Sequence, residues 1–284
     1  MEEQTQRSTT TPGASGQGIY LYCFARPGLP PGVAGGSLEN HEPVTFVEVD
    51  DVVAVCCRVT LDDFTGESGE SHFQDPTWVV PRACRHERVI EEVMKFSPVF
   101  PVRFGAVFSS REALAQAIVG RGTEISSFLD RVVGKEEWSV KGLVDIDKAA
   151  DRLLETDPAL AEQCRNLPEL PGARYFQQKR LRTEARKQAK HSCRSTAERA
   201  DQELAGLGES MSSGLKLGDA PDDKREVVLK RAFLLSRESV AEFRDRVMEI
   251  GSMVKEEAPS SLTLELSGPW PPYSFCPTPG KSKQ

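Results

Sequence analysis

The first residues to test for chemistry are a histidine and a glutamate that stand side by side, His86 and Glu87. A zinc protease helix carries two histidine ligands in the pattern H-E-x-x-H, because that spacing puts both imidazoles on one helical face. Here Ile90 occupies the position of the second histidine. The pattern therefore does not predict a metal site, and we expect His86 to be a structural, hydrogen-bonded imidazole.

No other familiar catalytic pattern is present. The remaining histidines lie far apart along the chain, at His41, His72 and His191. No G-x-S-x-G elbow marks a nucleophilic serine, and the glycines near Lys216 do not form the phosphate-binding pattern G-x-x-x-x-G-K-[ST]. The 7 cysteines are odd in number and include no C-x-x-C pair, so we expect reduced thiols. The sequence predicts no catalytic residue, no metal site and no cofactor.

One predicted helix concentrates basic side chains. They are Arg174, Lys179, Arg180, Arg182, Arg186, Lys187, Lys190, Arg194 and Arg199. Three interpretations are open: a solvated helix face, a docking surface for an acidic protein, or a nucleic-acid surface. The last is disfavoured, because no aromatic residue follows Phe176 in this helix and the whole chain carries a net charge of -7. We take Arg182, Arg186 and Lys190 as candidate partner contacts.

The elements that must position such residues are organised around the stretch from Trp78 to Ser110. In its first half, residues at helical spacing share one stripe: His86, Val89, Ile90, Val93 and Met94. Pro98 ends this helix, and beyond it the apolar period becomes two, as in a strand. The apolar face of the predicted strand carries Phe100, Val102, Phe104, Ala106 and Phe108. We expect Phe100, Phe104 and Phe108 to hold the first core.

The opposite face of this predicted strand is the second candidate contact surface. Pro101 cannot donate to a ladder, so it belongs at an edge, a bulge or a strand start, and Gly105 marks a close approach of another group. Arg103 lies between them, and we expect it to be structural, paired with a carboxylate. Pro101, Arg103 and Gly105 are therefore candidate partner contacts beside an exposed sheet edge.

Length and composition allow one large core or two modest ones, since the chain has 284 residues and is 38% hydrophobic, and we expect two. We predict a disordered tail over residues 1–17, an α+β domain over 18–134, a second one over 135–275 and a flexible tail over 276–284. No apolar run is long enough to span a bilayer, so we expect no lipid membrane and a cytoplasmic location.

The first domain should be a mostly antiparallel sheet with helices on one face. We expect a strand over 19–25, a tight hairpin of 44–49 with 52–59, a loop over 62–77, and helices over 110–119 and 123–133. For the second domain we expect a strand through Trp138, short helices over 146–154 and 158–167, a long charged helix over about 175–207, a strand over 227–235, a helix over 239–254 and a last strand over 262–266. That order favours a ferredoxin-like fold.

Two packing expectations concern the second domain. The long helix has only a thin apolar seam, formed by Leu181, Ala185 and Ala189 with Ser192 as a further candidate, so we expect it to pack lightly. At the end of the chain, three prolines should hold Trp270 and Tyr273 against the core. Trp138 and Trp270 are thus both predicted to be structural.

The order of these motifs resembles the gas vesicle protein F/L family. Four pieces carry the resemblance: the helix with His86 followed by F-P-V-R-F-G-A-V-F, then G-K-E-E-W-S-V-K from Gly134, then Y-F-Q-Q-K from Tyr175, and L-S-G-P-W-P-P-Y-S-F from Leu266. Together they span about residues 18 to 275. The resemblance implies two ferredoxin-like halves and a minor structural or assembly protein of the gas vesicle. Its implied partners are the major shell protein and other gas vesicle accessory proteins.

Two hypotheses follow for function. The resemblance implies a component that binds the major shell protein and helps nucleate or assemble the gas-filled shell, with no enzymatic activity. From the residues alone, a ferredoxin-like enzyme or small-ligand module stays open, because that fold hosts many activities. Polar residues that converge in one pocket would favour the ligand module, whereas an exposed apolar or aromatic patch would favour the assembly protein.

Overall fold

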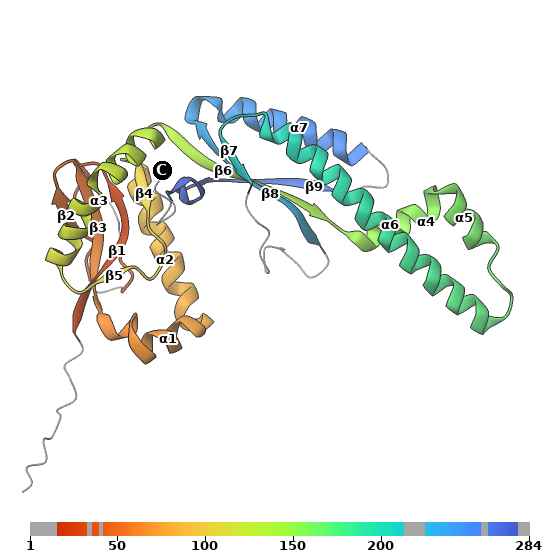
Figure 1. Cartoon of the computed structure of the whole chain (residues 1–284), viewed down its shortest axis with the longest axis horizontal. Helices are drawn as coiled ribbons and strands as arrows, with labels where there is room; N and C mark the ends of the chain where they lie inside the picture. The colour runs from red at the N-terminus through yellow and green to blue at the C-terminus, as the bar shows by residue number, and fades with distance from the viewer. Residues whose placement is uncertain (1–15, 33–35, 40–41, 213–224, 257–260, 278–284) are drawn as a thin grey trace, which may run out of the picture. The chain divides into compact units, whose positions relative to one another are not determined.

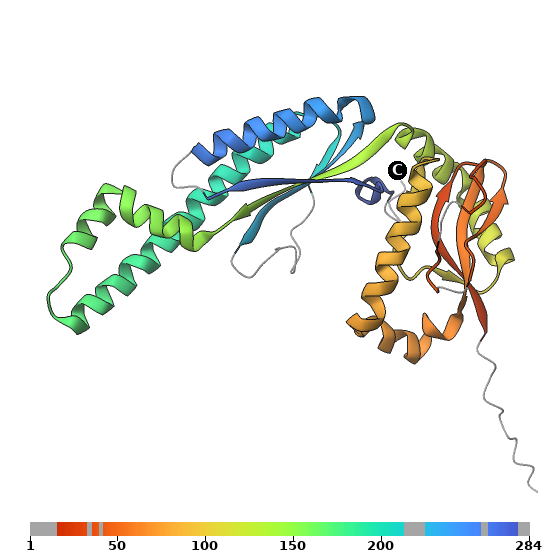
Figure 2. The same cartoon turned by 180° about the vertical axis from the view of Figure 1, so that it is seen from behind.

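The chain forms two compact units, Met1–Val133 and Gly134–Gln284 (Figures 1 and 2). The computed structural model describes residues 16–32, 36–39, 42–212, 225–256 and 261–277. Most of the predicted tails, over residues 1–17 and 276–284, lies outside the described residues. Each unit is built on its own antiparallel sheet and is described separately below. This confirms the predicted class of mixed helices and antiparallel sheets.

The first unit contains a sheet with the strand order β2-β3-β1-β4, and β5 also pairs with β1. Its elements are β1 (Gln17–Ala25), β2 (Thr45–Val49), β3 (Val52–Thr60), α1 (Gly66–Gln74), α2 (Pro76–Met94), β4 (Val99–Pro101), β5 (Val107–Phe108) and α3 (Arg111–Val132). β2 and β3 form the predicted tight hairpin, with Val49 opposite Val52 and Asp50 at a φ of 52° in the turn. Among the described residues, no helix lies between β1 and β2, so the ferredoxin-like prediction is not confirmed here.

Side chains from two helices pack on opposite faces of this sheet, whereas the sequence predicted helices on one face only. A β-bulge in β1 between Leu21 and Cys23 places Phe24 on the opposite face of the sheet from Tyr20. Before the bulge, Tyr20 packs against His86 of α2, with ring centroids 5.7 Å apart. After it, Phe24 packs against Phe100, whose ring lies 4.7 Å from Phe128 of α3. β1 is therefore buried on both sides.

Two local predictions in this unit are wrong. The expected loop over 62–77 contains helix α1, which is nearly all polar and so gives little apolar periodicity. Its Gly69 lies so close to Phe64 that a β-carbon there would be 2.5 Å from the Phe64 carbonyl carbon. The two helical pieces expected over 110–119 and 123–133 are one helix, α3, capped by the Ser110 side chain. Burial of its apolar face outweighs the poor helix propensity of Gly120 and Gly122.

The second unit contains a sheet with the order β7-β8-β6-β9. Its elements are β6 (Lys135–Val144), α4 (Ile146–Thr156), α5 (Pro158–Arg165), α6 (Pro171–Ala205), β7 (Ser210–Ser212), β8 (Glu226–Ser236), α7 (Val240–Glu256) and β9 (Thr263–Trp270). α6 and α7 lie along one face of this sheet (Figures 1 and 2). The sequence missed β7, a short strand inside a stretch that reads as a loop. The ferredoxin-like name stays a prediction for this unit.

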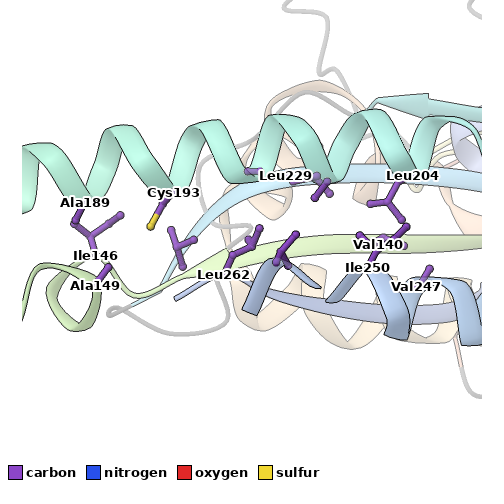
Figure 3. Packing of buried hydrophobic residues seen from close by; sticks show 14 of the residues in the cluster. Val140, Ile146, Ala149, Ala189, Cys193, Leu204, Leu229, Val247, Ile250 and Leu262 are labelled. Atoms are coloured by element: carbon purple, nitrogen blue, oxygen red, sulfur yellow. The ribbon is translucent and has the colours of Figure 1, made fainter. Parts of the chain in front are cut away.

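Helix α6 packs closely, contrary to the light packing predicted for it. Its buried seam is longer than expected and continues to Leu204, with Cys193 in the place proposed for Ser192. Figure 3 shows Ala189 and Cys193 directed toward Ile146 and Ala149, while Leu204 meets Val140 of β6. Alanine side chains let the α6 backbone approach its neighbours, so a thin seam is consistent with a dense interface.

The end of the chain is anchored differently from the prediction. Trp270 is 41% exposed, and its indole Nε1 donates only to Ser267 Oγ, at 3.2 Å. The buried anchor is Glu137, whose carboxylate accepts from the Ser274 backbone N–H at 2.9 Å and from the Ser274 hydroxyl at 2.7 Å. Burial raises the pKa of Glu137 above its usual range. Trp138, in contrast, is buried as predicted.

Gly268 gives a direct test of this ending. It has a φ of +145°, and a β-carbon there would lie 2.9 Å from both the Glu137 carbonyl oxygen and Trp138 Cδ2. Gly268→Ala should therefore lower the free energy of unfolding by about 1 to 3 kcal/mol, through backbone strain and overpacking. Gly251→Ala is the matched control, because its β-carbon would meet only Leu264 Cβ, at 3.9 Å, inside a helix. Equal melting curves for the two variants would contradict this account.

Candidate partner-binding surface

The candidate site lies where the predicted strand over Val99–Phe108 is interrupted. Only β4 and β5 are strands, and residues 102–106 form a loop between them. The loop stays attached to β1, because Val102 N–H donates to the Tyr22 carbonyl at 3.0 Å and Leu21 N–H donates to the Ala106 carbonyl at 2.9 Å. The loop therefore keeps backbone hydrogen bonds to β1 on both sides of Gly105. Gly105 itself turns the chain, with a φ of 95°.

A buried hydrogen-bond chain holds this loop. His86 Nε2 lies 2.9 Å from the Val102 carbonyl oxygen, which can only accept, so Nε2 carries the proton. In the neutral ring Nδ1 is then the acceptor, and it lies 2.8 Å from the Tyr20 hydroxyl. The Tyr20 oxygen in turn accepts from the Gly105 backbone N–H at 3.3 Å. His86 is therefore the satisfied, structural imidazole that the sequence predicted.

A second buried hydroxyl continues the polar layer. Tyr22 Oη accepts from the Leu38 N–H at 2.7 Å and lies 3.1 Å from Cys57 Sγ. Burial raises the pKa of Tyr22 above its usual range, and it raises the pKa of the Cys57 thiol to about 11. Burial likewise lowers the pKa of His86 to about 4. All three groups are therefore neutral near pH 7 and act as hydrogen-bonding parts of the core.

Above this layer lies an aromatic surface, which we define as His72, Phe73, Trp78 and Phe104. The His72 and Trp78 rings are stacked, with centroids 4.7 Å apart at 9°. Phe73 packs edge-on to Phe104 at 5.9 Å and to Trp78 at 6.0 Å. Beneath them, buried Phe64 lies 5.3 Å from Trp78. Phe73 is 41% exposed, and the other three are partly buried. The aromatic surface is thus open to solvent and fixed from below.

Trp78 is held on one side by a charged pair. The Arg82 guanidinium carbon lies 4.2 Å from the Trp78 ring centroid, a cation–π geometry. Arg82 Nε also donates to Glu39 Oε1 at 2.9 Å. With His72 also stacked on Trp78, this indole cannot rotate freely.

The three candidate contacts predicted from the strand have different outcomes. Gly105 lies beside the aromatic surface, and a β-carbon there would be 2.8 Å from Phe73 Cζ, which confirms the predicted close approach. Pro101 ends the edge strand β4, as predicted, but it is buried. Arg103 is exposed, and no carboxylate in the described part of the chain pairs with it, so the predicted ion pair is wrong.

The predicted core phenylalanines also differ. Phe100 is buried at 5% exposure, whereas Phe104 and Phe108 are only partly buried. Phe104 lies between the two environments, because its ring contacts the buried Tyr20 and His86 as well as Phe73 of the aromatic surface. The sequence missed Phe73 and Trp78 as site residues, because Phe73 lay in the expected loop. The signal available was the concentration of aromatic residues between Phe64 and Phe108.

The basic candidates Arg182, Arg186 and Lys190 belong to α6, in the other unit. Arg182 lies 3.5 Å from Asp151, Arg186 pairs with Asp147, and Lys190 lies 3.5 Å from Glu226. These pairs are about half exposed, so each contributes little to stability. They do partly neutralise the charge that made these residues candidates.

The described residues give no support to metal chemistry or membrane insertion. Within them, no group of three or more His, Cys, Asp or Glu side chains is placed to hold a metal ion. No helix in the described ranges is long and apolar enough to cross a membrane. The described hollows of the second unit are open. The one between α7 and β9 is mostly apolar, whereas two others are lined mainly by charged side chains, among them Glu242, Asp245 and Arg246 in one and Asp151, Arg152 and Glu155 in the other.

These observations define an α+β protein with two antiparallel sheets and a partly exposed aromatic surface fixed by ring contacts. Residues 18–277 match the family described as "Gas vesicle synthesis protein GvpL/GvpF". The chain belongs to this family, as the motifs predicted, and the family associates it with gas vesicles.

Two curated relatives agree with this membership. The chain is 26% identical over 266 residues to "Gas vesicle protein L" of Streptomyces sp., covering 90% of this chain and 91% of the relative. It is 26% identical over 269 residues to "Gas vesicle protein L2" of Halobacterium salinarum, covering 92% of this chain and 91% of the relative.

Two solved structures share the fold. The crystal structure of GvpF from Anabaena sp. PCC7120 matches with a TM-score of 0.63 and 18% identity, covering 92% of this chain and 97% of that one. The crystal structure of GvpF from Microcystis aeruginosa matches with a TM-score of 0.60 and 20% identity, covering 92% and 99%.

The His86 network predicts a pH dependence of stability. The unfolded imidazole binds a proton near pH 6.5, whereas the folded one does so only near pH 4. Between these values the unfolded state binds more protons, so the free energy of unfolding should fall as the pH falls, by about 3 kcal/mol in total. Urea unfolding of wild type and His86→Gln at several pH values measures this. The variant should show a flatter curve, and parallel curves would contradict the burial of a neutral His86.

Proposed function

We propose that this chain is an assembly protein of the gas vesicle that binds the major shell protein through the aromatic surface of its first unit. The observation that carries the proposal is the cluster of exposed Phe73 with partly exposed Trp78 and Phe104 in a chain of this family. Aromatic side chains are over-represented among the residues that dominate the energy of protein interfaces. Binding by such a surface requires no cofactor and no covalent step.

The rigidity of the aromatic surface supports this role. Association costs less when side chains are already fixed in their bound positions. Here Trp78 is stacked between His72 and Arg82, and Phe104 lies in the loop held by His86. Nucleation of the shell is the activity that we assign to the bound complex. Contacts with other gas vesicle accessory proteins would add to it.

The central experiment compares two phenylalanines of the same unit. Phe73→Glu places a charge in the aromatic surface and should weaken binding of purified shell protein by about tenfold or more. Phe96→Glu is the matched control, because Phe96 is 59% exposed but lies outside the aromatic surface. Binding is measured by biolayer interferometry with the full-length chain, with and without ATP and EDTA. Equal affinities for the two variants, or binding that requires ATP or a divalent metal, would overturn the proposal.

The same variants can be tested in cells. In a strain that lacks this gene, Phe96→Glu should restore gas-filled shells in electron micrographs, and Phe73→Glu should not. Phe96→Glu should melt close to wild type, whereas Phe73→Glu loses ring contacts with Phe64, Trp78 and Phe104 and should melt lower. Circular dichroism should therefore show that both variants are folded at the assay temperature.

We also propose that α6 steers association, but through other cations than Arg182, Arg186 and Lys190. Arg180, Lys187 and Arg194 recur every seven residues on an exposed stripe, and within the described residues none forms an ion pair. Free surface charges act mainly on the association rate. Reversal of these three to Glu should slow association with an acidic partner, and this effect should vanish at high salt.

Arg182, Arg186 and Lys190, the candidates predicted from the sequence, are less suitable for testing electrostatic steering. Reversal of Arg182 or Arg186 would place a carboxylate against Asp151 or Asp147 and disturb the α4–α6 contact. An unchanged association rate at low salt, after reversal of the unpaired stripe, would count against steering by α6. That result would leave the aromatic surface proposal intact.

A further inference from the structure

An open groove runs between helix α7 and strand β9 of the second unit. Its volume is about 790 Å³, and apolar side chains form most of its floor. Trp138, Val247, Met248, Leu262, Leu264 and Leu266 are the apolar lining residues. Met248 of α7 is 62% exposed beside this floor, so its long apolar side chain has no cover in the described chain. The groove is therefore an apolar surface that the described chain leaves open.

One wall of the groove is a sheet edge. β9 is the terminal strand of the described sheet, because it pairs with β6 alone. On the side away from β6, every second residue of β9 presents backbone N–H and C=O groups without a strand partner. Leu264 and Leu266 are only partly buried on its groove face. An unpaired strand beside an apolar groove is the arrangement that receives an extended peptide by strand addition.

The charged residues that line the groove indicate the charge of the segment that would bind there. Arg244 and Lys255 are its charged lining residues, and no carboxylate lines it. Neither cation forms an ion pair within the described residues, and Arg244 instead lies 4.5 Å from the ring centroid of Trp138. The groove thus favours an acidic occupant.

We propose that this groove binds an extended segment of a partner protein, added as a strand to β9. Alternate apolar side chains of the segment pack on Met248 and Leu264, and its carboxylates pair with Arg244 and Lys255. This site is separate from the aromatic surface of the first unit, and it stands whether or not that surface binds the shell protein.

The helix sets the spacing of the acidic residues. Arg244 and Lys255 are eleven positions apart on α7, which corresponds to about 16 Å along the helix axis. A strand covers that distance in about five residues. With the reach of the two long cationic side chains, the segment should carry carboxylates four to six residues apart, with apolar residues at alternate positions between them.

The chain's own ends do not fit this description. Residues 1–17 include Glu2 and Glu3 but no alternating apolar residues, and the last residues carry Lys281 and Lys283. A second copy of the groove would bring the same two cations against Arg244 and Lys255. Charge complementarity therefore favours a different protein as the partner.

The test is selection of a phage-displayed library of random short peptides on the full-length chain. Enriched peptides should be acidic, with alternating apolar residues. As free peptides they should bind Met248→Glu about tenfold or more weakly than wild type, because the new carboxylate repels them and occupies the apolar floor. Met253→Glu should bind them like wild type, since Met253 lies on the same helix and is 48% exposed but does not line the groove.

Backbone N-methylation of an enriched peptide tests the strand pairing. Methyl groups on one set of alternate residues should abolish binding, because those N–H groups face β9, whereas methylation of the other set should be tolerated. The proposal is overturned if no peptide is enriched, if enriched peptides are basic, if Met248→Glu and Met253→Glu bind alike, or if both methylated peptides bind. Light scattering that shows a dimer disrupted by Met248→Glu would instead assign the groove to a second copy.

Discussion

The hydrogen-bond chain from Val102 through His86 and Tyr20 to Gly105 is the constraint on which the first unit depends. It ties the loop between β4 and β5 to helix α2 and strand β1 at once. A protonated ring would donate from both nitrogens, and the Tyr20 hydroxyl would then need another acceptor in a buried place. Such buried polar groups are costly when unpaired, so the network specifies one arrangement of the loop. This hydrogen-bond chain therefore also fixes the position of Phe104 in the aromatic surface.

Sequence patterns predicted those helices and strands whose apolar spacing repeats over several residues. The apolar runs of β1 and β3, the stripe of α2 and the hairpin at Asp50 all follow from spacing that the structure keeps. The patterns failed where one residue changes the geometry. A single bulge at Tyr22 changes the face of Phe24, and Gly105 interrupts a strand whose alternation continues on both sides. The site residue Phe73 was missed, because its helix is nearly all polar and owes its position to packing on Phe64 and Gly105.

Helix α6 shows a different limit of sequence interpretation. An alanine seam has little hydrophobic area, so its packing energy was underestimated. Small side chains nevertheless let two helices approach closely, and dispersion contacts grow with that proximity. The basic residues beside the seam pair with acids of α4 and β8, which periodicity within one helix cannot predict. The stripe of Arg180, Lys187 and Arg194 therefore carries part of the excess charge of α6, together with exposed Arg174 and Lys179.

The two proposed sites would bind their partners through different interactions, and each therefore suits a different kind of partner. A rigid aromatic surface gives affinity from buried area and suits a folded, apolar partner. A sheet edge gives affinity through main-chain hydrogen bonds and suits an extended segment, with selectivity from the two cations beside it. One chain that carries both kinds of site can hold two unlike partners together. Each bound partner would then raise the effective concentration of the other, so weak individual contacts would suffice to hold both.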